Sequence, residues 1–264
     1  MSYEMPYEQP HASARGGRGR YPRETRPGRS RAEERCFDEY REQGRYLDFA
    51  CEDGEEFMDP FDYDELERMV AEFREDRHRR GIQAANADWV DEPLDDWLEG
   101  LDGRSPVERG TMMALVTGMR ETLSIRDALI LSLVIDERHC PKSQLMEFAA
   151  RPHQARTKRT MSRLLTWAFE DEGIVPDMDR CSTGVDLMLE MAIAAPVPYC
   201  VQPLAVASYV LWWMGEPKAI EFALQCLLLD EDCSLAAMIF SAADRGVAPA
   251  WCQTGRPFDG RIVV

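Results

Sequence analysis

Apolar residues recur at three- and four-residue spacing over most of the chain beyond residue 60, which is the pattern of helices that bury one face. No segment shows the sustained two-residue alternation of a strand, apart from the terminal Ile262-Val263-Val264. The sequence therefore predicts an all-α fold. The expected helices cover residues 63–80, 91–101, 106–119, 125–135, 141–150, 154–172, 183–195, 203–214, 217–229 and 233–245.

Several of these helices carry recognisable start and stop signals. Asp62 is a favourable N-cap for the first helix, whose last turn is basic and is followed by a terminating Gly81. Pro93 is expected near the start of the second helix. Three serines are interpreted in the same way as Asp62, and they place helix starts directly after Ser105, Ser124 and Ser182.

The last three predicted helices are joined by short turns, one centred on Gly215 and one at 230–232, so neighbouring helices must pack antiparallel. Small residues in the middle helix allow close helix contact, as in a tetratricopeptide-type hairpin. No second copy follows at the repeat period of ~34 residues. We therefore expect antiparallel helical hairpins packed in one domain, not a repeat array.

Charge divides the chain, whose formal net charge is −17, into distinct regions. Residues 1–35 carry eight Arg and five Glu among many Gly and Pro, which predicts a disordered Arg/Gly-rich tail. Residues 36–103 carry seven basic and 23 acidic side chains, and we expect an acidic, partly helical extension that folds onto the body. An all-helical domain is expected at 104–252 and a C-terminal tail at 253–264.

Cysteine usage and hydropathy favour a cytoplasmic protein. Eight cysteines are scattered along the chain without the spacing of a disulfide framework, as in a reducing compartment. The first 20 residues lack the apolar region of a secretory signal. The uncharged stretch at 191–215 contains three prolines in its first half, which indicates two helices and no membrane partner.

Residue patterns at 124–129, 203–212, 234–236 and 246–251, with Gly215, Ala223 and Asp230 between them, carry one family resemblance. They resemble the C-terminal half of an uncharacterised actinobacterial family, domain of unknown function four-one-nine-two. The resemblance implies a bacterial cytoplasmic origin, does not extend to residues 1–103, and brings no assigned activity.

The sequence lacks the motifs of the common catalytic and cofactor sites, including the nucleophile elbow, the P-loop and the paired-histidine zinc site. We expect no cofactor, no metal site and no catalytic set. His139-Cys140 is the one adjacent nucleophile and base pair, but its position before Pro141 is typical of a helix-ending turn. The acids crowded at 53–65 lack the order of a calcium loop and indicate a solvated face.

Two features are candidates for binding. Arg15, Arg18 and Arg20 lie in the Arg/Gly segment and are candidate contacts to nucleic acid. Trp212 and Trp213 lie about 100° apart on one helix, so one is expected in the core and the other along a groove for a partner.

These observations favour a noncatalytic helical module that binds a protein partner through its hairpin face, its acidic extension or both. Two alternatives stay open. One is a nucleic-acid-associated protein acting through the tail, and the other is an enzyme whose site forms only in the fold.

Overall fold

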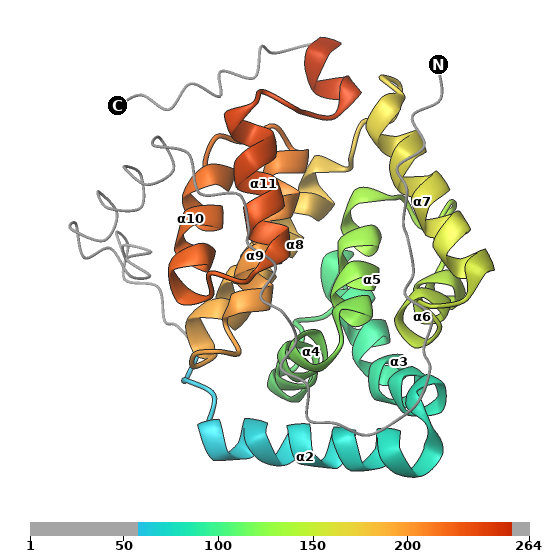
Figure 1. Cartoon of the computed structure of the whole chain (residues 1–264), viewed down its shortest axis with the longest axis vertical. Coiled ribbons are helices and arrows are strands. Elements are labelled where there is room, and N and C mark those ends of the chain that lie inside the picture. Colours follow the sequence, from blue (N-terminus) through green and yellow to red (C-terminus); the bar gives the residue numbers. More distant parts are fainter. Residues whose placement is uncertain (1–57, 255–264) are drawn as a thin grey trace, which may run out of the picture.

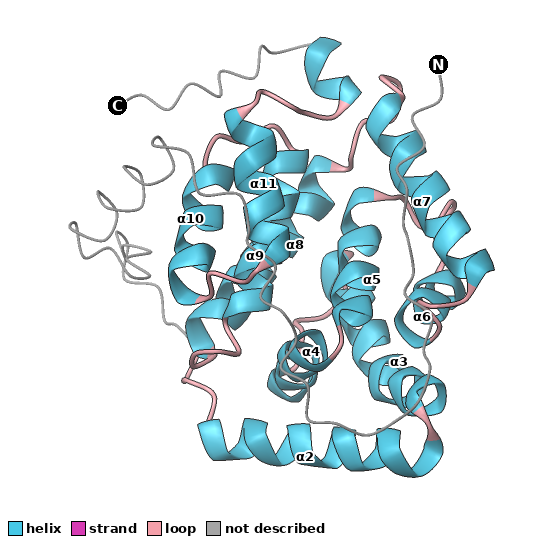
Figure 2. Cartoon of the chain, in the orientation of Figure 1, coloured by secondary structure: helices cyan, strands magenta, loops and turns pink. Residues whose placement is uncertain are grey.

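The computed structural model describes residues 58–254, and within this range the chain forms ten α-helices, one short 3-10 helix and no strand (Figures 1 and 2). The predicted all-α fold is therefore confirmed. The elements are α2 (Tyr63–Arg80), α3 (Ile82–Leu101), α4 (Arg109–Glu121), α5 (Leu123–Val134), α6 (Lys142–Ala150), α7 (Ala155–Glu170), α8 (Met178–Ala194), α9 (Val201–Trp213), α10 (Ala219–Leu229), α11 (Ser234–Asp244) and η1 (Ala250–Thr254).

The predicted limits of α2 are confirmed at both ends. The Asp62 carboxylate accepts the backbone N–H of Glu65 at 2.8 Å. At the other end, Gly81 has a φ of 88°, a backbone conformation that residues with a Cβ rarely adopt. The chain turns there into α3.

The prediction that the next helix begins at residue 91 was wrong, because α3 begins at Ile82 and holds Pro93 in its interior. Proline in a helix interior removes one backbone hydrogen bond. The helix continues because its earlier turns are buried, with Ala85 and Val90 each 1% exposed and the Asn86 amide donating to the Ala149 carbonyl at 3.2 Å.

Two serines that were predicted as caps have other roles. The segment containing Ser105 stays outside the helix, and α4 begins only after Glu108, whose N–H donates to Asp96 at 3.0 Å. Ser124 lies inside α5, and its hydroxyl donates to the Ala149 carbonyl at 2.7 Å. In both places tertiary contacts outweigh a local capping pattern.

The prediction that Ser182 caps a helix was also wrong. Asp177, five residues earlier, is the N-cap of α8, and its carboxylate accepts the N–H of Arg180 at 3.0 Å. The remaining helices begin and end within a few residues of their predicted limits.

A single hydrophobic core extends from Phe61 in front of α2 to Ala243 in α11. Helix α9 is buried on all sides, and α4, α5, α8, α10 and α11 pack around it. Helices α2 and α3 close the opposite side with Phe73, Leu94 and Trp97, each at most 1% exposed. The acidic helices therefore belong to the same core as the helices that follow them.

Helices α9, α10 and α11 form the predicted hairpin arrangement, in which α10 packs against both of its neighbours. Gly215 turns the chain between α9 and α10 with a φ of 76°. Pro196 and Pro198 lie between α8 and α9, so the uncharged stretch is divided between two helices. Across residues 58–254, no helix combines the length and apolar character needed to cross a bilayer.

Candidate protein-binding surface

The structure gives a different position for each binding feature proposed from the sequence. Arg15, Arg18 and Arg20 lie outside the described residues. Trp212 and Trp213 are both buried, at 6% and 2% exposure, so neither lines an open groove and the expected division between them was wrong.

The two indoles belong to an aromatic cluster at the C-terminal end of α9. Phe169 of α7 stacks on Trp212 with 5.9 Å between ring centroids, and Tyr209 stacks on Trp213 at 5.8 Å. The Trp212 Nε1–H donates to the Val247 carbonyl at 2.9 Å. Both indoles are therefore covered, by Phe169 of α7, by Tyr209 and by the segment after α11.

His139 and Cys140 do not form a nucleophile and base pair. His139 Nδ1 lies 2.8 Å from an Asp136 carboxylate oxygen, and its ring packs on Trp167 at 4.8 Å. Cys140 is 2% exposed, and burial raises the pKa of its thiol to about 12. A thiol that is protonated at neutral pH and closed to solvent is a core residue.

Among residues 58–254 there is also no group of three His, Cys, Asp or Glu side chains placed to hold a metal ion.

A feature that sequence reasoning missed lies at the start of α7. Residues 151–163 carry five basic side chains and no acidic one, whereas residues 58–254 as a whole carry 19 Lys and Arg against 34 Asp and Glu. All five are exposed. We call them the α7 cations: Arg151, Arg156, Lys158, Arg159 and Arg163.

The α7 cations differ from the other basic residues in their pairing. Most Lys and Arg side chains of the described range bond to a carboxylate or a backbone carbonyl, as when Lys142 bonds to both Asp91 and Asp95 at 2.6 and 2.7 Å. None of the five α7 cations has such a partner within residues 58–254, and the same holds there for Arg68, Lys218 and Arg245. Unpaired positive charge is thus concentrated in the first turns of α7 and at Arg151, which ends α6.

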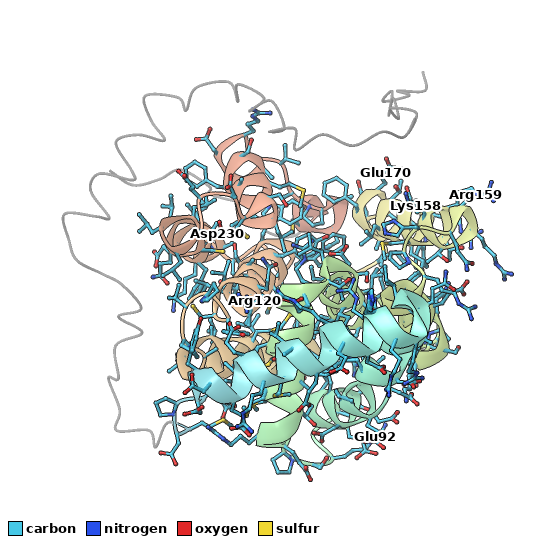
Figure 3. The ribbon with its side chains drawn as sticks, turned by 60° about the horizontal axis from the view of Figure 1, so that its bottom comes forward. Glu92, Arg120, Lys158, Arg159, Glu170 and Asp230 are labelled. Carbon is cyan, nitrogen blue, oxygen red and sulfur yellow. The ribbon has the colours of Figure 1, made fainter. Side chains whose placement is uncertain are left out.

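The charges of α7 also oppose its helix dipole. Arg156, Lys158 and Arg159 occupy the first turns, where the dipole is positive, and Glu170 ends the helix, where it is negative. Figure 3 shows Lys158 and Arg159 on the outer edge of the molecule, with Glu170 further along the same helix. The N-cap, Gln154, makes no capping hydrogen bond. This arrangement of charges destabilises the N-terminal end of α7. The stability of the fold therefore does not explain why basic residues lie there.

A shallow hollow between α3, α6 and the start of α7 is lined by two of these cations, Arg151 and Arg156. The other three, Lys158, Arg159 and Arg163, line a separate depression along α7 together with Trp167. The apolar residues that line the hollow, called its floor below, are Ala84, Ala87, Met146 and Ala150, which come from two helices far apart in sequence. Arg151 and Arg156 lie on its rim, together with Gln83, Ser143 and Glu147. The Glu147 carboxylate is the one negative group on the rim, and it accepts a hydrogen bond from the Thr157 hydroxyl at 3.4 Å.

The hollow continues toward the end of α2. Gln83 and Ala84 also line a second depression with Arg77, Arg80 and Ile82, and the Ile82 side chain is 52% exposed. We call the hollow, the depression along α7 and the α7 cations together the basic groove. It offers an apolar floor beside unpaired positive charge, which is the combination that binds an acidic segment carrying apolar side chains.

Part of this surface had a signal in the sequence, namely five cations without an acid over 13 residues, four of them on the helix predicted at 154–172. The floor had none, because it depends on how α3 and α6 pack. Comparison with protein-family models, with curated proteins and with solved structures gave no match. The family resemblance of residues 124–252 thus stays a prediction.

Proposed function

We propose that this chain is a noncatalytic protein-interaction module that binds an acidic, amphipathic segment of a partner protein in the basic groove. The observation that carries the proposal is the unpaired, exposed state of the α7 cations next to an apolar floor. The six cysteines of the described range are free thiols, which supports placing the module in a reducing cytoplasm.

Charge distribution favours a protein partner over nucleic acid at this surface. Residues 58–254 carry a balance of −15, so a long polyanion would meet repulsion beyond the groove. A short acidic segment meets only the local cations. The floor formed by Ala84, Ala87 and Met146 adds an apolar contact that a phosphate backbone would not use.

The test is a binding titration of the full chain, followed by fluorescence anisotropy. The probe is a fluorescein-labelled 16-residue peptide composed of Glu, Asp and Phe, and its control replaces every acid by Gln or Asn. We expect salt-sensitive binding of the acidic peptide only. The double variant Arg156→Glu with Arg159→Glu should weaken binding about tenfold or more, since each reversal turns an attraction into a repulsion.

A matched variant keeps the change in net charge the same. Lys218→Glu with Arg245→Glu reverses two cations that also lack a partner within the described range but line neither depression of the groove, and it should change affinity less than threefold. Equal weakening by both double variants would overturn the assignment to the groove. Binding of a labelled single-stranded RNA without binding of the acidic peptide would favour the nucleic-acid alternative instead.

A further inference from the structure

We propose that residues 36–57 of this same chain occupy the basic groove when no partner is bound, so that a partner must displace them. This inference rests on the proposed function of the groove. The first argument is charge, because residues 36–57 carry eight acidic and two basic side chains, a balance of −6. The α7 cations opposite them amount to five unpaired positive charges.

The second argument is the apolar content of the segment. Phe37, Tyr40, Tyr46, Leu47 and Phe49 are spread among its acids. A segment with only acids would satisfy the cations and leave the floor of the groove exposed. Aromatic and aliphatic side chains between the acids match both parts of the surface.

The third argument is where the segment is attached. Arg109 donates to the carbonyls of Asp59 and Pro60 at 2.5 and 2.8 Å, and the Phe61 N–H donates to the Ala194 carbonyl at 2.7 Å. The chain is therefore held immediately before α2, and the 18 residues of α2 lead to the groove, a length of about 27 Å. The 22 residues of 36–57 span up to about 75 Å when extended, which is enough to return along α2 to the groove.

Tethering makes even a weak contact effective. A segment attached through a short linker has a local concentration in the millimolar range at a surface it can reach. Because the segment and a partner use the same cations, every increase in occupancy by the segment lowers the apparent affinity for the partner. The bound segment also places negative charge at the N-terminus of α7, where it offsets the opposed charges of that helix.

The lysine content of the chain allows a direct test on the unmodified full-length protein. The sequence contains three lysines, of which Lys158 is an α7 cation. Treatment with a water-soluble carbodiimide joins a lysine amine to a carboxylate in direct contact, and mass spectrometry of peptides identifies the pair. We expect Lys158 to be joined to acids of 36–57, and mixing of isotopically heavy and light protein should show that the link forms within one chain.

Lys142 and Lys218 are the internal controls. Lys142 contacts Asp91 and Asp95 and should be joined to them. Lys218 is the N-cap of α10, which lies on the opposite side of the molecule from α7 in Figure 1, and should not be joined to 36–57. Linked Lys142 without a link from Lys158 to 36–57 would overturn the inference, as would equal linking of that segment to Lys218.

Competition separates this inference from the function on which it rests. The full-chain variant Asp48→Asn, Glu52→Gln, Asp53→Asn and Glu55→Gln removes four of the eight acids and should bind the acidic peptide probe at least tenfold more tightly than the wild-type chain. Equal binding to both proteins would end the inference and leave the proposed function intact. Binding to neither protein would contradict the proposed function, and the cross-link would then still decide whether the segment lies on α7.

Discussion

The indole Nε1–H of Trp97 donates to the Ser132 hydroxyl at 2.9 Å in the interior of the protein, joining α3 to α5. Ser132 in turn donates to the Leu129 carbonyl at 2.6 Å, so its hydroxyl both accepts and donates a hydrogen bond. Trp97 is fully buried and Ser132 is 2% exposed. This pair ties an acidic helix to the middle of the core.

Removal of either partner should therefore lower the free energy of unfolding. Ser132→Ala leaves the buried indole N–H without an acceptor and should cost about 1–3 kcal/mol. Trp97→Phe removes the donor and also leaves a cavity, and it should cost about 2 kcal/mol or more. Urea denaturation of both single variants and of the double variant checks this, and a coupling energy near zero would contradict a direct hydrogen bond.

These interior contacts explain which helix limits could be predicted from the sequence. Asp62 and Gly81 act through their immediate neighbours, so local patterns sufficed for α2. Ser124 also has the sequence pattern of a cap, but its hydroxyl donates a hydrogen bond to the carbonyl of Ala149, which is 25 residues away. Pro93 indicated a helix start, yet the burial of Ala85 and Val90 extends α3 by more than two turns before it. Such partners become known only when the fold brings them together.

The candidate surface, too, could be predicted from the sequence only in part. The α7 cations form a run that is visible in the sequence, although only the structure shows that they lack partners within the described residues. The floor combines Ala87 of α3 with Met146 of α6, and no periodicity predicts that contact. Of Trp212 and Trp213, one was expected along a groove, but both are buried, in contact with Phe169 and Tyr209.

The close approach of α8 to α5 predicts a strong effect at Gly184. A Cβ at this position would overlap the Cδ2 atom of Leu133, and Leu133 is 2% exposed and has little room to move. Gly184→Ala should therefore destabilise the protein by about 1–3 kcal/mol.

Gly110 provides the matched control for this change. It is an exposed helical glycine in α4, and the position that an alanine methyl would take there has no atom within 4 Å. Gly110→Ala should therefore stabilise the protein by about 0.5 kcal/mol. Thermal unfolding of both variants checks the pair. A neutral Gly184→Ala would show that α5 and α8 are less tightly packed than described.

The Tyr199 hydroxyl donates to the Glu67 carboxylate at 2.8 Å, and Arg120 bonds to the same oxygen at 3.1 Å. The hydrogen bond from Tyr199 is the largest effect on the pKa of Glu67 and lowers it. Burial raises this pKa, and Arg120 lowers it further, so that it lies below its ordinary value. A lowered pKa stabilises the folded state above the unfolded-state pKa of the carboxyl, and this contribution is lost as the pH falls through the folded-state pKa.

Tyr199→Phe should therefore be destabilising at pH 7 and less so in acid, once the pH is below the lowered pKa of Glu67 and this carboxyl is protonated in the wild-type protein as well. Urea denaturation across this pH range measures the difference. Tyr209→Phe is the control, since Tyr209 is buried in the aromatic cluster and Asp127 acts on it only through space, with no hydrogen bond to a carboxylate within residues 58–254. Its effect should not change over the same range. The same pH dependence for both variants would argue against the assigned role of Glu67.

Arg156 is the second residue of α7, where positive charge opposes the helix dipole. Arg156→Glu should raise the free energy of unfolding by about 0.3–1 kcal/mol at low salt while it weakens binding of the acidic peptide. Arg163→Glu, two turns further along, should weaken binding with a smaller effect on stability. Loss of stability in Arg156→Glu would mean that this arginine supports the fold.

The hydrogen bond from Phe61 to Ala194 has a consequence for synthesis on the ribosome. The groups that fix the start of α2 are Arg109, Ala194 and Tyr199, and they are all translated after it. The apolar stripe of α3 likewise has to wait for α4, α5 and α6 before it can be covered. Helices α2 and α3 thus leave the exit tunnel before the residues that stabilise them are synthesised. Until then, the acidic outer faces of both helices keep them hydrated.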